Sequence, residues 1–266
     1  MKISLIIPVY NESDNVFKLS DEVTKVLSKT QIEWECIWVD DGSDDNTWQK
    51  IETLSEPHKG LKLRTNCGQA TATMAGIEIS KYEYLITLDG DGQNDPNDIL
   101  SMVQCIKANP DLDLVQGYRD KREDHKYKKI IPSRIANIIV RSISGYKVLD
   151  LGCSLRLFKK SLVKNFRLTG EMHRLFTLYL LDNGASMIQI AVTHRPRTAG
   201  VTKYGFGRVQ KLLTDIVLYK ALKVIFISPI YTFAKFAITG YLFSFTLLLL
   251  AIILKAIGVK ISLMEI

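Results

Sequence analysis

Residues 84–93 read YLITLDGDGQ, a short apolar run that leads into two carboxylates one residue apart. An apolar run of this length that ends in a glycine-bearing turn is typical of a buried strand. Asp89 and Asp91 are therefore predicted to leave one strand end together, with their oxygens directed at a single ion. Carboxylates, substrate phosphates and water are the ligands that Mg²⁺ and Mn²⁺ prefer. The stretch predicts a divalent-metal site suited to a reaction in which a diphosphate departs.

Short apolar runs alternate with longer helical segments along most of the chain. Strands are predicted at residues 3–8, 34–40, 61–64, 84–89 and 112–117. Helices are predicted between them at residues 15–28, 47–54, 70–80 and 98–108. Further along, helices are predicted at 126–144 and 171–181, and strands at 155–158 and 187–192. This alternation indicates an α/β fold with a doubly wound, mostly parallel sheet.

Three polar clusters come directly after predicted strands. They are Tyr10-Asn11-Glu12, Asp40-Asp41-Gly42-Ser43 and the run from Asp89 to Gln93. Ligands of doubly wound sheets sit outside the carboxyl ends of the strands, so this topology places all three clusters at one edge. We interpret the carboxylate at the end of the second strand as a group that recognises a nucleotide base or ribose.

The charges of the chain are divided unevenly. Residues 1–118 hold 10 Lys and Arg against 20 Asp and Glu, whereas residues 119–223 hold 22 against 7. The division indicates an acidic half that uses a cation and a basic half that meets anions. Nucleic acid and a phosphorylated lipid at a membrane surface are the two candidate anions. The four cysteines show no paired spacing, which favours reduced thiols in a cytosolic body.

The C-terminal part of the chain favours the membrane over nucleic acid. Residues 236–254 are uncharged and rich in Leu, Ile and Phe, and as a helix they would span about 28 Å, one hydrocarbon core. A buried core helix is the alternative. Cations are denser before this stretch than after it, so the positive-inside tendency predicts a cytoplasmic N-terminal body. We expect a domain over 1–206, an amphipathic interfacial helix over 207–228 and a single-pass membrane anchor over 229–266.

A basic run with glycines follows the strand predicted at 187–192. Arg197 supplies a guanidinium fork, Thr202 a hydroxyl and Lys203 an ammonium group. Gly200 between them allows the backbone to turn. This combination suits a phosphate group, to which arginine offers paired donors and lysine a point charge. A solvated charged loop is the alternative interpretation.

Two other metal sites are weaker alternatives. The run that begins at Asp41 has ligand types at the spacing of a calcium loop, but Asn46 stands where that loop requires glycine. A zinc site would lack ligand spacing, since it would have to combine Cys153, His173 and His194. Arg156 has an acidic neighbour in the sequence, and an ion pair with Asp150 is its simplest expected role.

Taken together, these motifs resemble family 2 glycosyltransferases of the GT-A fold, in particular the polyprenyl-phosphate group around dolichol-phosphate mannose synthase. The resemblance extends from Ile3 to about Arg208, and the following helix and apolar span agree with it. It is carried by Pro8-Val9-Tyr10-Asn11-Glu12, Asp40-Asp41-Gly42-Ser43, Asn66-x-Gly68-Gln69, Asp89-Gly90-Asp91-Gly92-Gln93 and Arg197-x-x-Gly200-x-Thr202-Lys203-Tyr204. The order and spacing of these motifs are specific, although no single motif is.

The resemblance implies a role for each matching residue. The metal, Mg²⁺ or Mn²⁺, would be held on the donor diphosphate by Asp89, Asp91 and Gln93. The nucleotide would be held by Pro8, Tyr10, Glu12 and Asp40. The phosphates of nucleotide and lipid would be faced by Arg119, Ser133, Arg134, Arg197 and Lys203, with Ser133 and Arg134 on the acceptor. Relatives with several membrane spans suggest that a second copy or a partner subunit completes the lipid-facing surface here.

The activity implied is a metal-dependent, inverting transfer of a sugar from a nucleoside diphosphate sugar, GDP-mannose or a UDP-hexose, to undecaprenyl or dolichyl phosphate at the cytoplasmic leaflet. A phosphate monoester has a second pKa of about 6, so it is already a nucleophile at pH 7 and needs no dedicated base. The alternatives are a glycosyltransferase with a sugar-hydroxyl acceptor in cell-surface polysaccharide synthesis, and a non-catalytic, membrane-tethered protein that binds nucleotide sugars. No nucleic-acid partner is expected.

Overall fold

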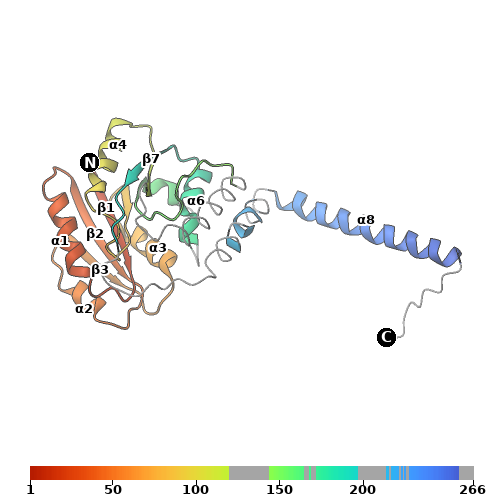
Figure 1. The fold of residues 1–266 in the computed structure, drawn as a ribbon, viewed down its shortest axis with the longest axis horizontal. Coiled ribbons are helices and arrows are strands. Elements are labelled where there is room, and N and C mark those ends of the chain that lie inside the picture. Colours follow the sequence, from red (N-terminus) through yellow and green to blue (C-terminus); the bar gives the residue numbers. More distant parts are fainter. Residues whose placement is uncertain are drawn as a thin grey trace. The chain divides into compact units, whose positions relative to one another are not determined.

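The computed structural model of the chain describes residues 1–119, 144–164, 168, 172–196, 214–215, 217–221, 223, 225 and 228–257. The chain divides into two compact units, Met1–Ile216 and Val217–Ile266. Within the described residues, the first unit contains a seven-stranded sheet with helices packed against it (Figure 1). The second unit contains one long helix, α8.

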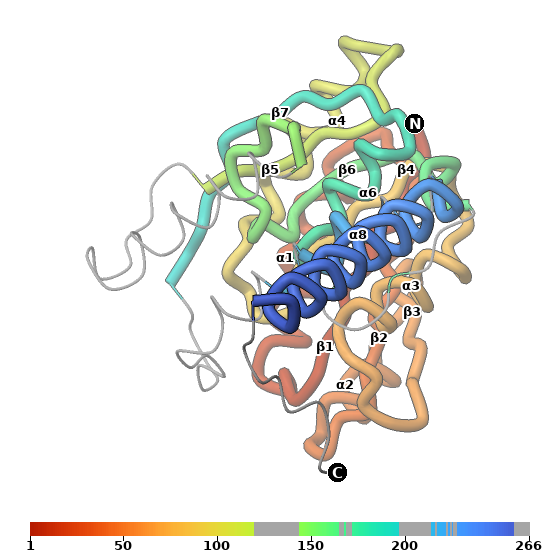
Figure 2. Tube along the Cα trace, turned by 90° about the vertical axis from the view of Figure 1, so that its right-hand side faces the viewer, coloured from red at the N-terminus to blue at the C-terminus, as the bar shows by residue number. Residues whose placement is uncertain are grey.

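The sheet orders its strands β3-β2-β1-β4-β6-β5-β7. The strands are Lys2–Val9 (β1), Glu33–Asp40 (β2), His58–Lys62 (β3), Tyr84–Thr87 (β4), Leu114–Arg119 (β5), Arg156–Lys159 (β6) and Met187–Val192 (β7). Neighbouring strands are parallel except where β6 pairs with β4 and β5. The predicted mostly parallel sheet is confirmed. In Figure 2, β7, β5, β6 and β4 lie together in the upper part of the first unit.

One edge of the sheet, which we call the carboxyl edge, collects the strand ends that carry the polar clusters. The strands β1, β2, β4, β5 and β7 run in one direction, so their carboxyl ends share this edge. β6 runs the opposite way, and its first residue, Arg156, therefore lies at the same edge, opposite Thr87 and Gln116. The chain thus leaves the carboxyl edge after Arg119 and returns to it at Arg156.

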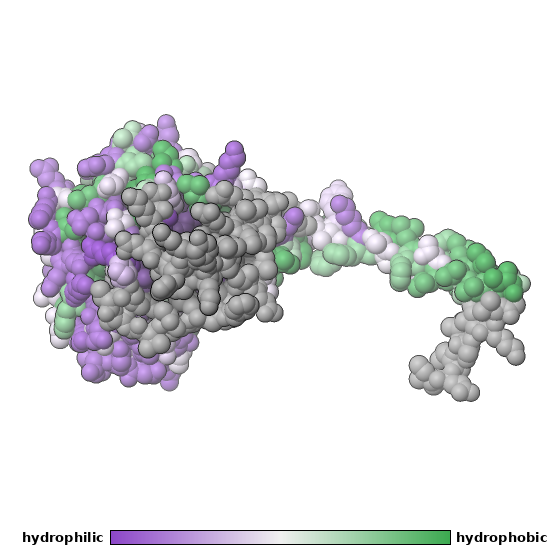
Figure 3. Space-filling view, viewed as in Figure 1, coloured by the Kyte–Doolittle hydropathy of each residue, from purple (hydrophilic) through white to green (hydrophobic). Residues whose placement is uncertain are grey.

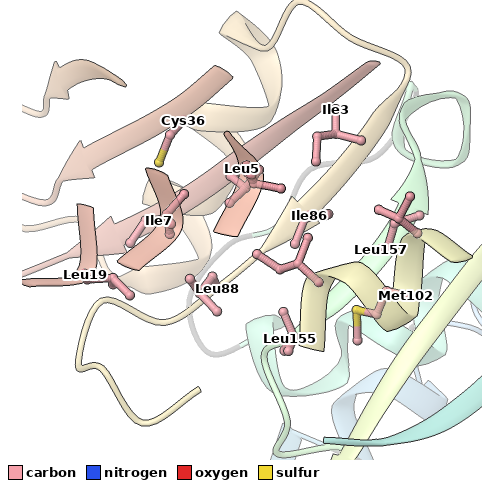
Figure 4. Close-up of a cluster of buried hydrophobic side chains, with 14 of the residues drawn as sticks. Ile3, Leu5, Ile7, Leu19, Cys36, Ile86, Leu88, Met102, Leu155 and Leu157 are labelled. Carbon is pink, nitrogen blue, oxygen red and sulfur yellow. The ribbon is translucent and has the colours of Figure 1, made fainter. Parts of the chain in front are cut away.

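Helices cover both faces of the sheet. They are α1 (Val16–Leu27), α2 (Thr47–Glu52), α3 (Gln69–Ile79), α4 (Asp98–Ala108) and α6 (Phe176–Asp182). Ile3, Leu5 and Ile7 of β1 belong to one buried cluster with side chains of α1 and α4 (Figure 4). Ile6, which points to the other face, packs in a second cluster with side chains of α3 and α6. With both faces buried, the edges of the sheet remain the places where a ligand can reach it.

The predicted and observed elements differ mainly at the borders of the sheet. The sequence predicts a strand at 61–64, whereas β3 begins at His58 and ends at Lys62. β3 is an edge strand with an exposed Lys59 and Lys62, and charged side chains on edge strands break the apolar pattern that reveals a strand. The helix predicted at 171–181 starts as the 3₁₀ turn Met172–Leu175 before α6. The helices predicted at 126–144 and 207–228 fall largely outside the described residues.

His58 joins β3 to the rest of the sheet and makes the stability of the fold depend on pH. Its ring accepts a hydrogen bond from Trp38 Nε1 at 3.2 Å, and its Nε2 lies 2.8 Å from Thr24 Oγ1. Burial lowers the pKa of His58 below its usual value of 6.5. The unfolded chain therefore binds a proton more readily than the folded one, and stability falls as pH drops below about 6.5.

We expect the melting temperature of the wild type to fall between pH 7 and pH 5 more steeply than that of His58→Gln. The variant is less stable at pH 7, because the buried ring contacts with Trp34 and Trp38 are lost. Its pH profile is flatter, because the group that takes up a proton on unfolding is gone. Thermal unfolding followed by circular dichroism at each pH measures both the stability at pH 7 and the steepness of the pH profile. Parallel profiles for the two proteins would contradict the assignment.

α8 (Pro229–Ala256) contains the apolar span predicted at 236–254. Its 28 residues extend over about 42 Å, more than a hydrocarbon core. Within the part of the chain that the structure describes, it is the one helix whose length and composition suit a membrane crossing. Its large apolar side chains are exposed, and Figure 3 colours most of the helix as hydrophobic.

Candidate active site

The loop after β4 brings two carboxylates to the carboxyl edge. Asp89 Oδ1 accepts a hydrogen bond from Gln69 Nε2 at 2.7 Å. Burial raises the pKa of Asp89, and the nearby carboxylate of Asp91 raises it further. A buried carboxylate whose charged form is disfavoured by a second carboxylate favours a cation between the two. Gly90 is required here, because a Cβ at that position would lie 2.3 Å from Val9 Cγ1.

The same loop offers a neutral oxygen from Gln93. The main-chain N–H of Gln93 donates to Asp91 Oδ1 at 3.1 Å. Its side-chain nitrogen donates to the carbonyl oxygen of Arg195 at 3.4 Å, which directs the amide oxygen away from that contact. The amide oxygen accepts no hydrogen bond from the described residues. Asp89, Asp91 and Gln93 thus present the oxygen donors that Mg²⁺ and Mn²⁺ take.

The side chains of Asp89, Asp91 and Gln93 suit a divalent ion that takes only some of its ligands from the protein. Groups of three or more His, Cys, Asp or Glu side chains suited to a metal do not occur in the described residues. Two carboxylates and an amide oxygen leave about three octahedral positions for water and phosphate oxygens. A site of this kind suits an ion that arrives with, or is completed by, a diphosphate.

The loops after β1 and β2 interlock beside the loop from Asp89 to Gln93, which follows β4. Asn11, in a left-handed conformation with φ of 54°, donates its N–H to Ser43 Oγ at 2.9 Å. The Tyr10 hydroxyl donates to Asp44 Oδ2 at 3.3 Å. The Glu12 N–H donates to Thr47 Oγ1 at 2.9 Å. The first two polar clusters predicted from the sequence are therefore in direct contact.

Asp40 is fully buried at the end of β2 and has one unpaired oxygen. Its Oδ1 accepts hydrogen bonds from the N–H and the hydroxyl of Ser43. Its Oδ2 is buried and has no hydrogen-bond partner among the residues that the structure describes. An orphaned buried carboxylate oxygen is costly, and a donor on a bound ligand would relieve that cost. Pro8, the other residue predicted nearby, is paired with Val39 in the sheet.

Asp41 is a structural residue and not a calcium ligand. Its two oxygens accept from the main-chain N–H groups of Cys67 and Gly68 at 2.8 and 2.9 Å. Asp45, the next acid of the proposed calcium loop, accepts from the N–H of Thr47 at 2.9 Å. The calcium alternative therefore has no support in the structure. Asp41 instead fixes the turn before α3, and this turn places Gln69 against Asp89.

Arg119 at the end of β5 forms a nearly buried ion pair with Asp150. Arg119 Nε and Nη2 donate to the two carboxylate oxygens at 2.6 and 2.8 Å, and both side chains are only 11–12% exposed. Gly152 makes room for the pair, since a Cβ there would lie 2.7 Å from Arg119 Nη2. The predicted pairing of Asp150 with Arg156 is wrong. Two of the donors of Arg119 are engaged in the protein itself.

Arg156 is a buried cation at the start of β6, paired with Thr87 at the end of β4. Its Nη2 donates to the carbonyl oxygen of Cys153 at 2.8 Å, and its guanidinium lies 5.2 Å from the ring centre of Phe176. Its Nε is buried and finds no hydrogen-bond partner in the described part of the chain. The charge of Arg156 acts to lower the pKa of Asp89 and partly offsets the effects that raise it. Sequence reasoning missed this role, because the contact depends on the antiparallel pairing of β6 with β4.

The zinc alternative also has no support. Burial raises the pKa of the Cys153 thiol to about 11, which disfavours the thiolate that zinc binding requires. His194 instead forms an isolated bridge with Asn94, the residue after Gln93. The predicted phosphate residues Ser133, Arg134, Arg197 and Lys203 lie outside the described residues. The segments that carry them start at the carboxyl edge, after β5 and β7.

Comparison with solved structures identifies the fold class. Glucosyl-3-phosphoglycerate synthase from Mycobacterium tuberculosis, solved with Mn²⁺, UDP and glucosyl-3-phosphoglycerate, superposes with a TM-score of 0.63. The match covers 82% of this chain and 79% of that protein at 14% identity. The chain therefore has the α/β architecture of GT-A-type glycosyltransferases, with a mixed sheet.

Sequence comparison then gives the family. Residues 4–167 match the family described as glycosyl transferase family 2, and the chain belongs to that family. A dodecaprenyl-phosphate galacturonate synthase from Rhizobium johnstonii is 37% identical over 224 residues, covering 82% of this chain and 66% of the relative. An undecaprenyl-phosphate 4-deoxy-4-formamido-L-arabinose transferase from Pseudomonas fluorescens is 32% identical over 254 residues, covering 93% and 73%. The chain spans about two thirds of the length of such relatives.

Proposed function

We propose that the protein transfers a sugar from a nucleoside diphosphate sugar to a polyprenyl phosphate. The observation that carries this proposal is the carboxyl edge, which holds both the paired carboxylates of Asp89 and Asp91 and an orphaned buried carboxylate oxygen of Asp40. Two relatives are named after dodecaprenyl phosphate and undecaprenyl phosphate, and these names support a lipid acceptor. Their sugars, galacturonate and 4-deoxy-4-formamido-L-arabinose, favour a donor other than GDP-mannose. A UDP-linked sugar is the donor we put first.

The proposed mechanism needs positioning more than acid–base chemistry. Asp89, Asp91 and Gln93 would hold the ion, which when bound neutralises the negative charge that builds up on the departing diphosphate. Pro8, Tyr10, Glu12 and Asp40 would hold the nucleotide, with the open Oδ2 of Asp40 accepting from the base.

The acceptor phosphate would be held by cations on the segments that leave the carboxyl edge. In this proposal Arg119 faces the phosphates with the nitrogen that Asp150 does not engage, together with Ser133, Arg134, Arg197 and Lys203. A phosphate oxygen of the lipid attacks the anomeric carbon while the bond to the diphosphate breaks, and the nucleoside diphosphate leaves. In-line attack inverts the anomeric configuration.

We propose that the protein works at the cytoplasmic face of a membrane. α8 has the length and composition of a span, and its apolar side chains are exposed. The organisation we propose is a glycosyltransferase domain over 1–206, an interfacial helix over 207–228 and an anchor over 229–266. A second copy of the chain or a membrane partner would complete the lipid-facing surface.

The test is incubation of the purified protein with Mn²⁺, a short-chain polyprenyl phosphate and a mixture of nucleotide sugars. The mixture contains GDP-mannose, UDP-glucose, UDP-galactose and UDP-galacturonate. We expect mass spectrometry of the lipid extract to show one added sugar residue from one donor, and no product from the unphosphorylated polyprenol. Transfer only to added oligosaccharides would instead support a sugar-hydroxyl acceptor. Binding of a nucleotide sugar without transfer to any acceptor would support a non-catalytic protein.

A further inference from the structure

The three residues that follow β7 are each joined to the segment from Gln93 to Asp98. The Thr193 N–H donates to Asp98 Oδ2 at 2.7 Å. His194 forms an isolated bridge with Asn94. The Arg195 N–H donates to the carbonyl oxygen of Gln93 at 2.8 Å, and the Gln93 side-chain nitrogen donates back to the carbonyl oxygen of Arg195. These segments lie about a hundred residues apart in sequence, and nothing in the metal motif itself predicts the contact.

The side chain of Arg195 forms ion pairs with two further elements, and these pairs hold the contact in place. Its Nη1 lies 2.6 Å from Glu22 Oε2 on α1, and its Nη2 lies 2.8 Å from Asp95 Oδ2 in the turn before α4. All three side chains are partly buried, with exposures between 17% and 32%. A guanidinium can bridge two acids on different elements because its donors point in fixed directions. A lysine ammonium is a single point charge and cannot reproduce that geometry.

We propose that Arg195 is a positioning residue for the metal site, which it serves by fixing the main chain and the side-chain amide of Gln93. The proposal rests on the proposed function, since it takes Asp89, Asp91 and Gln93 as the metal ligands. With its nitrogen bound to the Arg195 carbonyl, the amide of Gln93 can turn only its oxygen toward the ion. Residues that orient ligands from behind typically change metal affinity by about 10–100-fold when they are replaced.

The experiment measures binding of Mn²⁺ to the full-length protein without substrates, from the decrease of the free Mn²⁺ signal in electron paramagnetic resonance. We expect Arg195→Gln to raise the Kd for Mn²⁺ about tenfold, and Arg195→Lys to recover only part of that loss. Glu22→Gln, which removes one arm of the bridge and lies on α1, is expected to have a smaller effect in the same direction. In activity assays, the Mn²⁺ concentration for half-maximal rate should rise while kcat at saturating Mn²⁺ changes little.

Lys159→Gln is the matched control. The pair of Lys159 with Asp113 has a similar length of 2.7 Å and similar exposure, 24% and 27%, but lies at the opposite edge of the sheet beside Tyr84. The control should lower the melting temperature about as much as Arg195→Gln and leave Mn²⁺ affinity unchanged. Equal Mn²⁺ affinity in the wild type and Arg195→Gln overturns the inference, whatever the melting temperatures show.

The variant Asp91→Asn distinguishes a failure of the role proposed for Arg195 from a failure of the proposed function. If Asp91→Asn weakens Mn²⁺ binding and Arg195→Gln does not, the metal site stands and only the role of Arg195 is overturned. If Asp91→Asn leaves Mn²⁺ binding unchanged, the ion binds elsewhere, and both the proposed function and this inference are overturned.

Discussion

Replacing Asp91 with Asn is expected to lower kcat/KM for sugar transfer about a thousandfold, or about 4 kcal/mol of transition-state stabilisation. The substitution keeps the shape of the side chain and an oxygen that can accept from the Gln93 N–H. It removes one of the two charges that hold the ion at the moment when the diphosphate gains negative charge. Initial rates with labelled nucleotide sugar and polyprenyl phosphate, at saturating Mn²⁺, measure the effect.

A control and a stability measurement make this result specific. Asp111→Asn removes an exposed acid just before β5, near the opposite edge of the sheet, and should leave the rate unchanged. The melting temperature of Asp91→Asn in the absence of metal should equal or exceed that of the wild type, because repulsion with Asp89 is relieved. A rate within tenfold of the wild type would rule out Asp91 as a metal ligand.

Breaking the ion pair between Arg119 and Asp150 is expected to lower the free energy of unfolding by about 3 kcal/mol. Asp150→Asn takes the charged partner from a nearly buried guanidinium, and Arg119→Gln takes the guanidinium from a nearly buried carboxylate, which keeps the main-chain N–H of Gly152 as a donor. Urea unfolding of the isolated variants, followed by circular dichroism, measures the loss. The double variant should be more stable than the sum of the two single losses predicts, since no uncompensated charge remains.

The exposed pair of Lys2 and Glu33 provides the comparison for this prediction. Its side chains are 60% and 50% exposed, so water screens the two charges from each other. Lys2→Gln should change stability much less than either substitution in the Arg119 pair. Additive losses in the double variant of Arg119 and Asp150 would show that the two side chains do not stabilise each other.

The part of the site that could be predicted from the sequence is the part that the topology dictates. Tyr10, Asp40 and Asp89 each follow an apolar strand of a βαβ pattern, and parallel strands bring their carboxyl ends to one edge. The apolar runs are strong signals because both faces of these strands are buried. Whether these residues bind nucleotide and metal stays a prediction.

The contacts that support the site could not be predicted, because they join residues far apart in sequence. Gln69 meets Asp89 because Asp41 fixes the turn before α3, and Arg195 reaches α1 across 173 positions. Asp150 forms its ion pair with Arg119 and not with Arg156, because β6 enters the sheet between β4 and β5 in the opposite direction. No local pattern of charges or apolar residues encodes such a strand order.

The reversed direction of β6 brings the chain back to the edge of the sheet that it left after β5. β5 ends and β6 begins at this edge, so the number of residues between Arg119 and Arg156 does not set the register of the two strands. We therefore expect chimaeras that swap only residues 120–143 between homologues, and keep Asp150, Cys153 and Leu155 at their contacts with Arg119, Arg156 and the core, to fold and to take their acceptor preference from the homologue that supplies the segment.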